Sequence, residues 1–139
     1  MRVVVDTNVF VSYLLSPRGT TAWLLFLWRD GRFGIVISPT LFTELVGVLQ
    51  RPHISGRVDI QRRFSLLRRL REEAIWTPGE LDASGSTPDP KDDMLISAAL
   101  ETAAQYVVTW DVALLTQGKH NDVRLITPEE FITLVRRTD

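Results

Sequence analysis

Short apolar runs alternate with helical patterns along the whole chain, and this alternation limits the possible folds more than any other feature. The clearest runs are Val3–Val5, Ile35–Ile37, Tyr106–Thr109 and Val123–Ile126. Val3–Val5 is apolar without interruption, which is typical of a strand buried on both faces of a parallel sheet. The pattern predicts an α/β domain with a mostly parallel sheet and helices on both of its faces.

The segments between these runs carry helix signals. Helices are expected at residues 9–15, 22–29, 40–50, 59–74, 92–104 and from 128 to about 137. Ser38 before Pro39 and Thr127 before Pro128 are good N-cap positions, and Thr20 or Thr21 could cap the second helix. Ile75-Trp76 is expected to be a minimal strand, and residues 79–90 are expected to form a loop.

Composition narrows the possible chemistry. The 139 residues suit one domain, residues 1–139. The chain has no cysteine and only two histidines, so a metal site would need oxygen ligands, which favours Mg²⁺ or Mn²⁺. No apolar run approaches the roughly 20 residues that span a membrane. The N-terminus enters its first strand directly, without a signal-peptide pattern, so we expect a cytoplasmic protein.

Acidic residues follow the predicted strands. Asp6 and Asp111 come at or just beyond strand ends, Asp92 and Asp93 open a helix, and Glu44 lies one turn into another. In a parallel sheet, strands end and helices begin at the same edge, where ligands bind. We therefore expect these acids to gather at one rim.

A cluster of carboxylates without basic partners is unfavourable unless a cation intervenes, because the charges repel. A divalent metal removes the repulsion, lowers the pKa of bound water and stabilises charge on a phosphate under attack. The cluster therefore indicates metal-assisted phosphodiester hydrolysis. Thr7 and Asn8 could orient Asp6 or hold waters of the metal. Each acid alone could be a turn former, helix cap or solvated residue, and only their coincidence supports this chemistry.

Four segments of the sequence resemble the motifs of PIN (PilT N-terminal) domains, in the family's order and over nearly the whole chain. They are Val3–Ser12, Ile37–Leu45 continuing to Pro52, Asp89–Leu100, and Tyr106–Asp111 followed by Leu114-Leu115. Residues 15–19 and 22–25 match the branch described as toxin components of toxin–antitoxin pairs.

The resemblance implies a three-layer α/β/α sandwich and Mg²⁺- or Mn²⁺-dependent cleavage of single-stranded RNA. It also implies an antitoxin partner and a homodimer. The family's acidic site maps to Asp6, Glu44, Asp93 and Asp111, as catalytic residues and metal ligands, with Asn8, Thr7 and Asp92 in support. The motif can be registered on either Asp92 or Asp93, so the closer ligand stays open. Ala113 and Lys91 stand where this branch often has acids, which reduces the local negative charge.

Other functions fit the sequence less well. A haloacid-dehalogenase-like phosphatase would need a second Asp where Asn8 stands, and a receiver domain would need a Lys soon after Val108. A degenerate PIN module that binds RNA or a protein without catalysis remains an alternative, although the acids are intact at every motif.

Two further patterns each have two interpretations. Arginines that cluster around the expected helix 59–74 could bind the RNA backbone, but a solvated face whose aliphatic stems cover the core is favoured. They are Arg57, Arg62, Arg63, Arg68, Arg69 and Arg71. The stripe Trp23, Leu24, Leu27 and Trp28 is typical of core, with a partner interface as the alternative.

Overall fold

The structure is a computed structural model that describes residues 1–138, and it contains a six-stranded sheet flanked by helices. The strands are β1 (Arg2–Val5), β2 (Gly34–Ile37), β3 (Ile75–Trp76), β4 (Tyr106–Val108), β5 (Lys119–His120) and β6 (Val123–Ile126). Their spatial order is β3-β2-β1-β4-β6-β5. All neighbours pair in parallel except β5, which runs antiparallel to β6.

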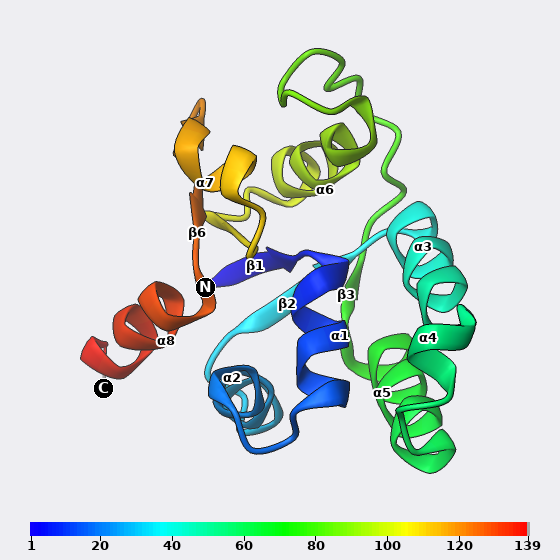
Figure 1. The fold of residues 1–139 in the computed structure, drawn as a ribbon. Coiled ribbons are helices and arrows are strands. Elements are labelled where there is room, and N and C mark those ends of the chain that lie inside the picture. The colour runs from blue at the N-terminus through cyan, green and yellow to red at the C-terminus, as the bar shows by residue number, and fades with distance from the viewer. Residues whose placement is uncertain (139) are drawn as a thin grey trace.

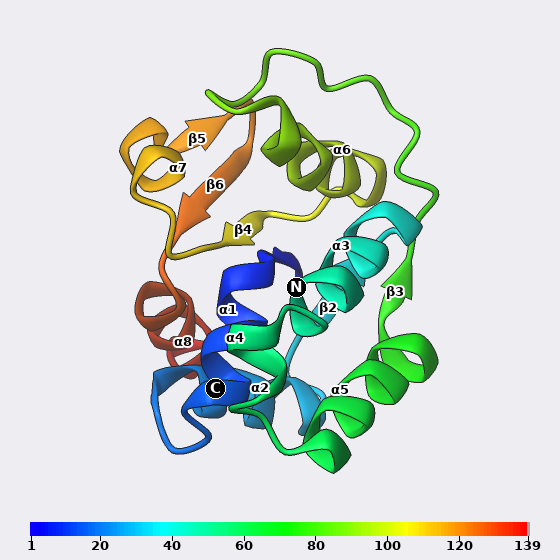
Figure 2. The same cartoon turned by 45° about the vertical axis from the view of Figure 1, so that its right-hand side comes forward.

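Helices cover both faces of the sheet. They are α1 (Thr7–Leu15), α2 (Thr20–Arg29), α3 (Pro39–Leu49), α4 (Pro52–Ser55), α5 (Ile60–Glu73), η1 (Pro90–Asp92), α6 (Asp93–Thr102), α7 (Val112–Gln117) and α8 (Pro128–Arg137). In Figure 1, α6 lies above the sheet, against β1, β2 and β4, and α1, α2 and α8 lie below it. In Figure 2, α4 and α5 lie below α3. The α/β prediction and its three-layer arrangement are confirmed.

The core lies between these layers. The central strand β1 is fully buried at Val3 and Val4, and the adjacent strands β2 and β4 are buried at Ile35 and Val107. This explains the uninterrupted apolar runs, because a central parallel strand meets side chains on both faces. None of the helices within residues 1–138 is long and apolar enough to cross a membrane.

Local cap signals placed several helices correctly. The Ser38 hydroxyl accepts a hydrogen bond from the Leu41 amide, and Thr127 and Glu130 form a reciprocal capping box at the start of α8. The prediction for α2 was wrong: Gly19 is its N-cap, so both Thr20 and Thr21 lie inside the helix. The sequence also missed α4, α7 and β5, which are too short to show a periodicity of their own.

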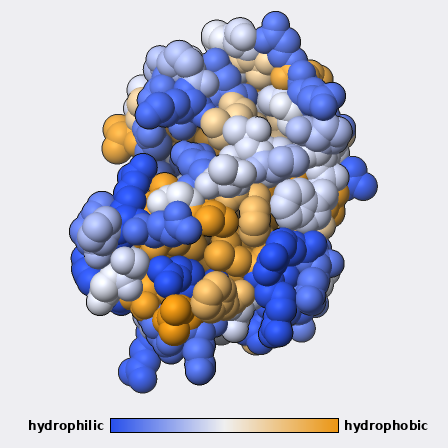
Figure 3. Space-filling model, turned by 90° about the vertical axis from the view of Figure 1, so that its right-hand side faces the viewer, coloured by the Kyte–Doolittle hydropathy of each residue, from blue (hydrophilic) through white to orange (hydrophobic). Residues whose placement is uncertain are grey.

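The helix α5 is amphipathic, but part of its apolar side is open to solvent. Ile60 and Phe64 are 53% and 59% exposed, whereas Leu66 and Leu70 are buried. Figure 3 shows apolar surface on the side of the molecule that carries α3, α4 and α5, bordered by hydrophilic residues. On α2, the core interpretation is confirmed for Leu24, Leu27 and Trp28, but Trp23 is 60% exposed.

Candidate functional site

Asp6 ends the central strand and begins α1. Its backbone N–H donates to the carbonyl of Val108 (2.9 Å), which extends the β1–β4 pairing to the sheet edge. The carboxylate is buried, and its Oδ2 accepts hydrogen bonds from Thr109 Oγ1 (2.8 Å) and Asn8 Nδ2 (3.3 Å). Burial raises the pKa of Asp6 and the Thr109 hydrogen bond opposes that rise. Asp6 is therefore a rigidly held carboxylate that ionises less readily than a free aspartate.

Thr109 connects Asp6 with Asp111, which lies beyond the end of the neighbouring strand β4. Its fully buried hydroxyl donates to Asp6 and accepts from the backbone N–H of Asp111 (2.9 Å). Asp111 in turn caps α7, and its Oδ1 accepts from the N–H of Ala113 (2.8 Å). The sequence did not predict a role for Thr109. The available signal was a polar residue at the end of a buried strand, which is weak because threonine is common in strands.

Asn8 adds further hydrogen bonds between the residues that follow β1 and those that follow β4. Its Nδ2 donates to Asp6, and its Oδ1 accepts from the backbone N–H of Trp110 (3.3 Å). The side chain thus joins the start of α1 to the segment after β4. Thr7, the other residue expected to assist, is buried beside Asp6 and lines a cleft together with it.

Glu44 reaches this edge from α3, six residues after the Ser38 cap. Burial, and after it the charge of Asp6, raises the pKa of Glu44. Both carboxylates line one cleft, although they come from different elements. The structure therefore brings Glu44, Asp6 and Asp111 together at the carboxyl edge of the sheet.

Asp92, not Asp93, joins this group. Burial raises the pKa of Asp92 to about 6, with further contributions from Asp6, Asp111, Asp89 and Glu44. These contributions place Asp92 in the field of the other acids, and its side chain lines the same cleft. Of the two adjacent acids, the structure thus places Asp92 in the cleft with the other carboxylates.

Asp93, expected in the acidic group, instead holds the preceding loop. Its carboxylate accepts hydrogen bonds from the N–H of Gly85 (3.0 Å), the N–H of Thr87 (2.9 Å) and the hydroxyl of Thr87 (2.7 Å). Although desolvation acts in the opposite direction, the hydrogen bonds from Thr87, Gly85 and Ser86 lower the pKa of Asp93. Asp92 and Asp93 face different directions because each residue of a helix is rotated by about 100° from the one before it.

The acidic group lines a cleft of about 350 Å³. Its walls are formed by Asp6, Thr7, Asn8, Val11, Glu44, Val48, Arg51, His53, Ile54, Asp92 and Asp111. Arg51 and His53 were not predicted as site residues. Arg51 lies at the end of the second motif, and His53 follows it directly.

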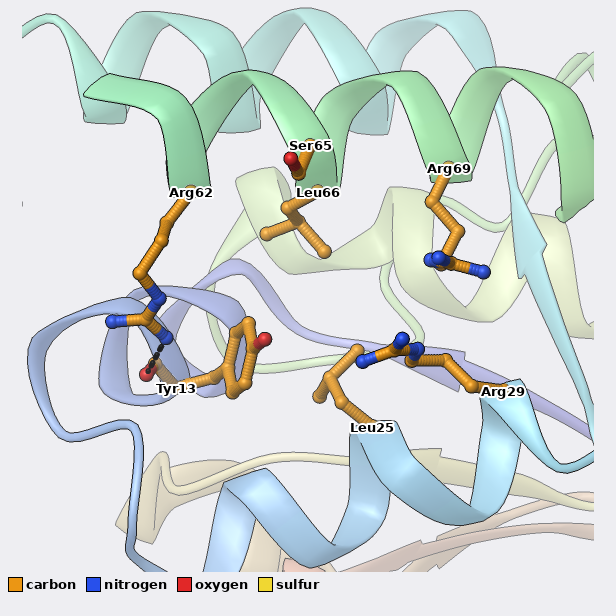
Figure 4. A pocket seen from close by; sticks show the side chains of 7 residues that line it. All are labelled: Tyr13, Leu25, Arg29, Arg62, Ser65, Leu66 and Arg69. Carbon is orange, nitrogen blue, oxygen red and sulfur yellow. Dashed lines mark hydrogen bonds between the residues drawn. The ribbon is translucent and has the colours of Figure 1, made fainter. Parts of the chain in front are cut away.

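A second cavity of about 220 Å³ lies between α1, α2 and α5 (Figure 4). It contains part of the predicted arginine-rich face, but Arg62 donates to the carbonyl of Leu14 (3.3 Å) and stacks 5.2 Å from the Tyr13 ring centroid. Arg69 pairs with Glu73 (2.9 Å), and Arg63, outside the cavity, donates to the carbonyl of Leu49 (3.0 Å). These contacts favour the structural interpretation of that face for Arg62 and Arg63, which tie α5 to the ends of α1 and α3.

The donor set of the acidic cleft suits a hard divalent cation. Within residues 1–138, no three acidic or histidine side chains are already gathered into a metal-binding cage. The carboxylates nevertheless converge from four elements, and the pKa values of Asp6, Glu44 and Asp92 are all raised. Mutually repelling oxygen ligands of this kind fit Mg²⁺ or Mn²⁺, whose charge would lower those pKa values.

Comparisons with known proteins agree with this architecture. The structure resembles a crystal structure of VapBC2 from Rickettsia felis bound to a DNA fragment from their promoter, with a TM-score of 0.57 and 19% sequence identity. The alignment covers 90% of this chain and 97% of that chain, and at this identity it supports the fold alone. A search of curated proteins gives no match. The PIN domain family model matches residues 2–113, which include every acidic residue of the cleft, so the chain belongs to the PIN domain family.

Proposed function

We propose that this chain is a Mg²⁺- or Mn²⁺-dependent endoribonuclease that hydrolyses phosphodiester bonds of single-stranded RNA. The observation that carries the proposal is the gathering of Asp6, Glu44, Asp92 and Asp111 in one cleft at the carboxyl edge of the sheet. Membership of the PIN domain family supports it. We propose that the nuclease domain spans residues 1–139 and acts in the cytoplasm.

The residues of the cleft have distinct roles in this proposal. Asp6, Glu44, Asp92 and Asp111 would hold the cation, which when bound supplies Lewis-acid chemistry to the phosphodiester. Thr109 and Asn8 fix the carboxylate of Asp6 through hydrogen bonds to its Oδ2. Asp111 is held by its cap of α7. Asp93 acts at a distance, because it anchors the loop that leads into Asp92.

We further propose that the chain is the toxin of a type II toxin–antitoxin pair, works as a homodimer and is held by an antitoxin protein. Support comes from the motif resemblance and from the VapBC2 complex that shares the fold. Coexpression with the product of an adjacent gene for a small DNA-binding protein tests this directly. We expect the partner to copurify and to relieve growth arrest; arrest that persists in its presence would contradict the pairing.

Cleavage of a mixed-sequence single-stranded RNA tests the enzymatic proposal. We expect cutting with Mg²⁺ or Mn²⁺, none with EDTA, and a loss of about 100-fold or more in Asp6→Asn, because that change removes a ligand charge. Asp122→Asn is the matched control, since Asp122 is exposed between β5 and β6 and does not line the cleft. A folded wild-type protein that binds RNA but cuts it with neither metal would instead indicate a degenerate binding module.

A further inference from the structure

The acidic cleft has a basic border. Arg51 and His53 line it together with the carboxylates, and both side chains are exposed. Burial and Asp6 raise the pKa of Glu44, and Arg51 lies close enough to offset part of that rise. One wall of the cleft therefore carries negative charge while another presents a cation directly to solvent.

The backbone holds this basic border in a fixed position. Helix α3 ends at Leu49, and Pro52 restricts Arg51 to an extended conformation (φ −63°, ψ 135°) before α4 begins. The carbonyl of Arg51 accepts hydrogen bonds from the amides of Ile54 (2.9 Å) and Ser55 (2.8 Å). Ile54 is itself 7% exposed and anchors the turn to the core. Arg51 and His53 thus extend from a rigid corner, which reduces the entropy lost when they bind a ligand.

The same cleft also offers apolar contact surface. Val11 of α1, Val48 of α3 and Ile54 of α4 line it alongside the charged residues. A ligand that matches the whole cleft must combine anionic groups with a less polar body. Single-stranded RNA has this composition, because phosphates alternate with riboses and bases that can pack on apolar side chains.

Arg51 and His53 can supply the positive charge that an anionic ligand needs near the acidic cleft. The chain has a net charge of −1, so bulk charge does not attract RNA, and the carboxylates repel every phosphate whose charge is not neutralised locally. Arg62, Arg63 and Arg69 are engaged elsewhere on α5 and do not line the cleft. Arginine suits a phosphate well, since its planar guanidinium can donate two parallel hydrogen bonds to it.

We propose that Arg51 and His53 bind the RNA backbone phosphate next to the one that is cut, while Val11, Val48 and Ile54 contact the sugar and base between them. This inference rests on the proposed function for the nature of the ligand. It makes Arg51 and His53 positioning residues that set substrate affinity and register, and it assigns them no part in the bond-breaking step.

Binding of a fluorescein-labelled, mixed-sequence single-stranded RNA tests the inference without any need for cleavage. Anisotropy is measured in Ca²⁺, which takes the same oxygen ligands, over a series of salt concentrations. For Arg51→Gln we expect binding about tenfold weaker at low salt, and a slope of log K against log salt reduced by about 0.7, the value for one lost phosphate contact on a single strand. Arg51→Lys should recover most of the slope, because the charge returns, and His53→Gln should weaken binding in the same direction.

The matched control is Arg136→Gln, because Arg136 is an exposed arginine in the last turn of α8 that does not line the cleft. An Arg51→Gln slope equal to that of the wild type and of Arg136→Gln would overturn the inference. Cleavage kinetics in Mg²⁺ add a second readout: we expect KM to rise with kcat nearly unchanged, whereas a purely structural defect would lower kcat too.

The two proposals can fail separately. RNA that binds with the expected slope change but is never cut would contradict the nuclease and uphold the phosphate contact. RNA that is cut by a wild type and an Arg51→Gln variant with equal KM and equal slope would uphold the nuclease and contradict the contact. A wild type that neither binds nor cuts RNA would contradict both.

Discussion

Asp92 and Asp93 are adjacent in sequence but lie in opposite environments. Burial and neighbouring acids raise the pKa of Asp92 to about 6. Against the effect of desolvation, hydrogen bonds from Thr87, Gly85 and Ser86 lower the pKa of Asp93. A carboxylate surrounded by acids is suited to receive a cation, and one surrounded by N–H and O–H donors is already satisfied. The structure thus places one acid of this dipeptide in the cleft and uses the other to anchor the loop.

Paired substitutions test this division of roles. We expect Asp92→Asn to lower kcat/KM by about 100-fold or more while the protein stays folded. Asp93→Asn should keep most of the activity but lose about 1 kcal/mol of stability, because its donors lose a charged acceptor. Cleavage assays and urea midpoints measure the two effects. If Asp93→Asn abolished cutting at unchanged stability, Asp93 would be a ligand after all.

At the scale of elements, α6 organises the long loop between β3 and η1. Glu101 accepts hydrogen bonds from the Thr77 hydroxyl (2.6 Å) and from the amides of Gly79 (2.6 Å) and Glu80 (2.8 Å), and Asp93 holds the far part of the loop. Gly79 is required where the loop passes α3, because it has φ +71° and an added Cβ would lie 2.9 Å from Ser38 Cβ. Two carboxylates of one helix therefore fix the path that leads into the site.

Acidification should release the Glu101 end of this loop. The Thr77 hydrogen bond and the loop amides lower the pKa of Glu101 to about 2, from 4.5 for a free side chain. A lowered pKa means that this stabilisation is complete above about pH 4.5 and is lost as the pH falls towards 2. Hydrogen exchange at residues 79–81 should therefore accelerate, relative to its intrinsic rate, over that range in the wild type.

Glu101→Gln provides the comparison for that experiment. We expect faster exchange and faster proteolysis of the loop at pH 7, with much of the pH dependence between 4.5 and 2 removed, because the amide cannot ionise. The exposed neighbour Glu80 supplies the control Glu80→Gln, which should behave as the wild type does. A Glu101→Gln loop as well protected as that of the wild type would contradict an anchoring role.

At the scale of the whole molecule, the acidic cleft lowers the stability of the folded protein. The topology brings carboxylates from β1, α3, η1 and the end of β4 to one edge, and the pKa values of Asp6, Glu44 and Asp92 are raised there. A raised pKa in the folded state means that the acid's contribution to stability is complete below its unfolded pKa and is lost as the pH rises. For Asp92 that window runs from 3.8 to about 6.

Thermal unfolding of the metal-free protein measures this cost. We expect Asp92→Asn to match the wild type near pH 4 and to exceed its Tm at pH 7 by about 3 °C, or about 1 kcal/mol once solvent screening of the half-buried side chain is allowed for. Mg²⁺ should raise the Tm of the wild type at pH 7 and have little effect on Asp6→Asn. An Asp92→Asn variant less stable than the wild type at pH 7 would show that Asp92 is stabilising rather than repelled.

The local sequence alone predicted most of the elements. Strands β1, β2, β4 and β6 follow from their apolar runs, and the starts of α3 and α8 follow from caps at Ser38 and Thr127. The edge strand β5 was missed because two residues show no periodicity, and it forms only by pairing with β6. On α5, Ile60 and Phe64 share a helical spacing with Leu67 and Leu70 but are exposed, because spacing alone does not give the width of the surface that covers an apolar stripe.

The sequence by itself determined that strands and helices alternate, and hence that Asp6, Glu44 and Asp111 approach one edge of a parallel sheet. That conclusion needs only local patterns, because parallel strands share their carboxyl edge. Tertiary structure alone decided that Asp92 faces the cleft, that Thr109 bonds to Asp6 across 103 residues of sequence, and that Arg51 borders the acids. Such choices depend on which distant side chains pack together, and that information is not contained in any local run of residues.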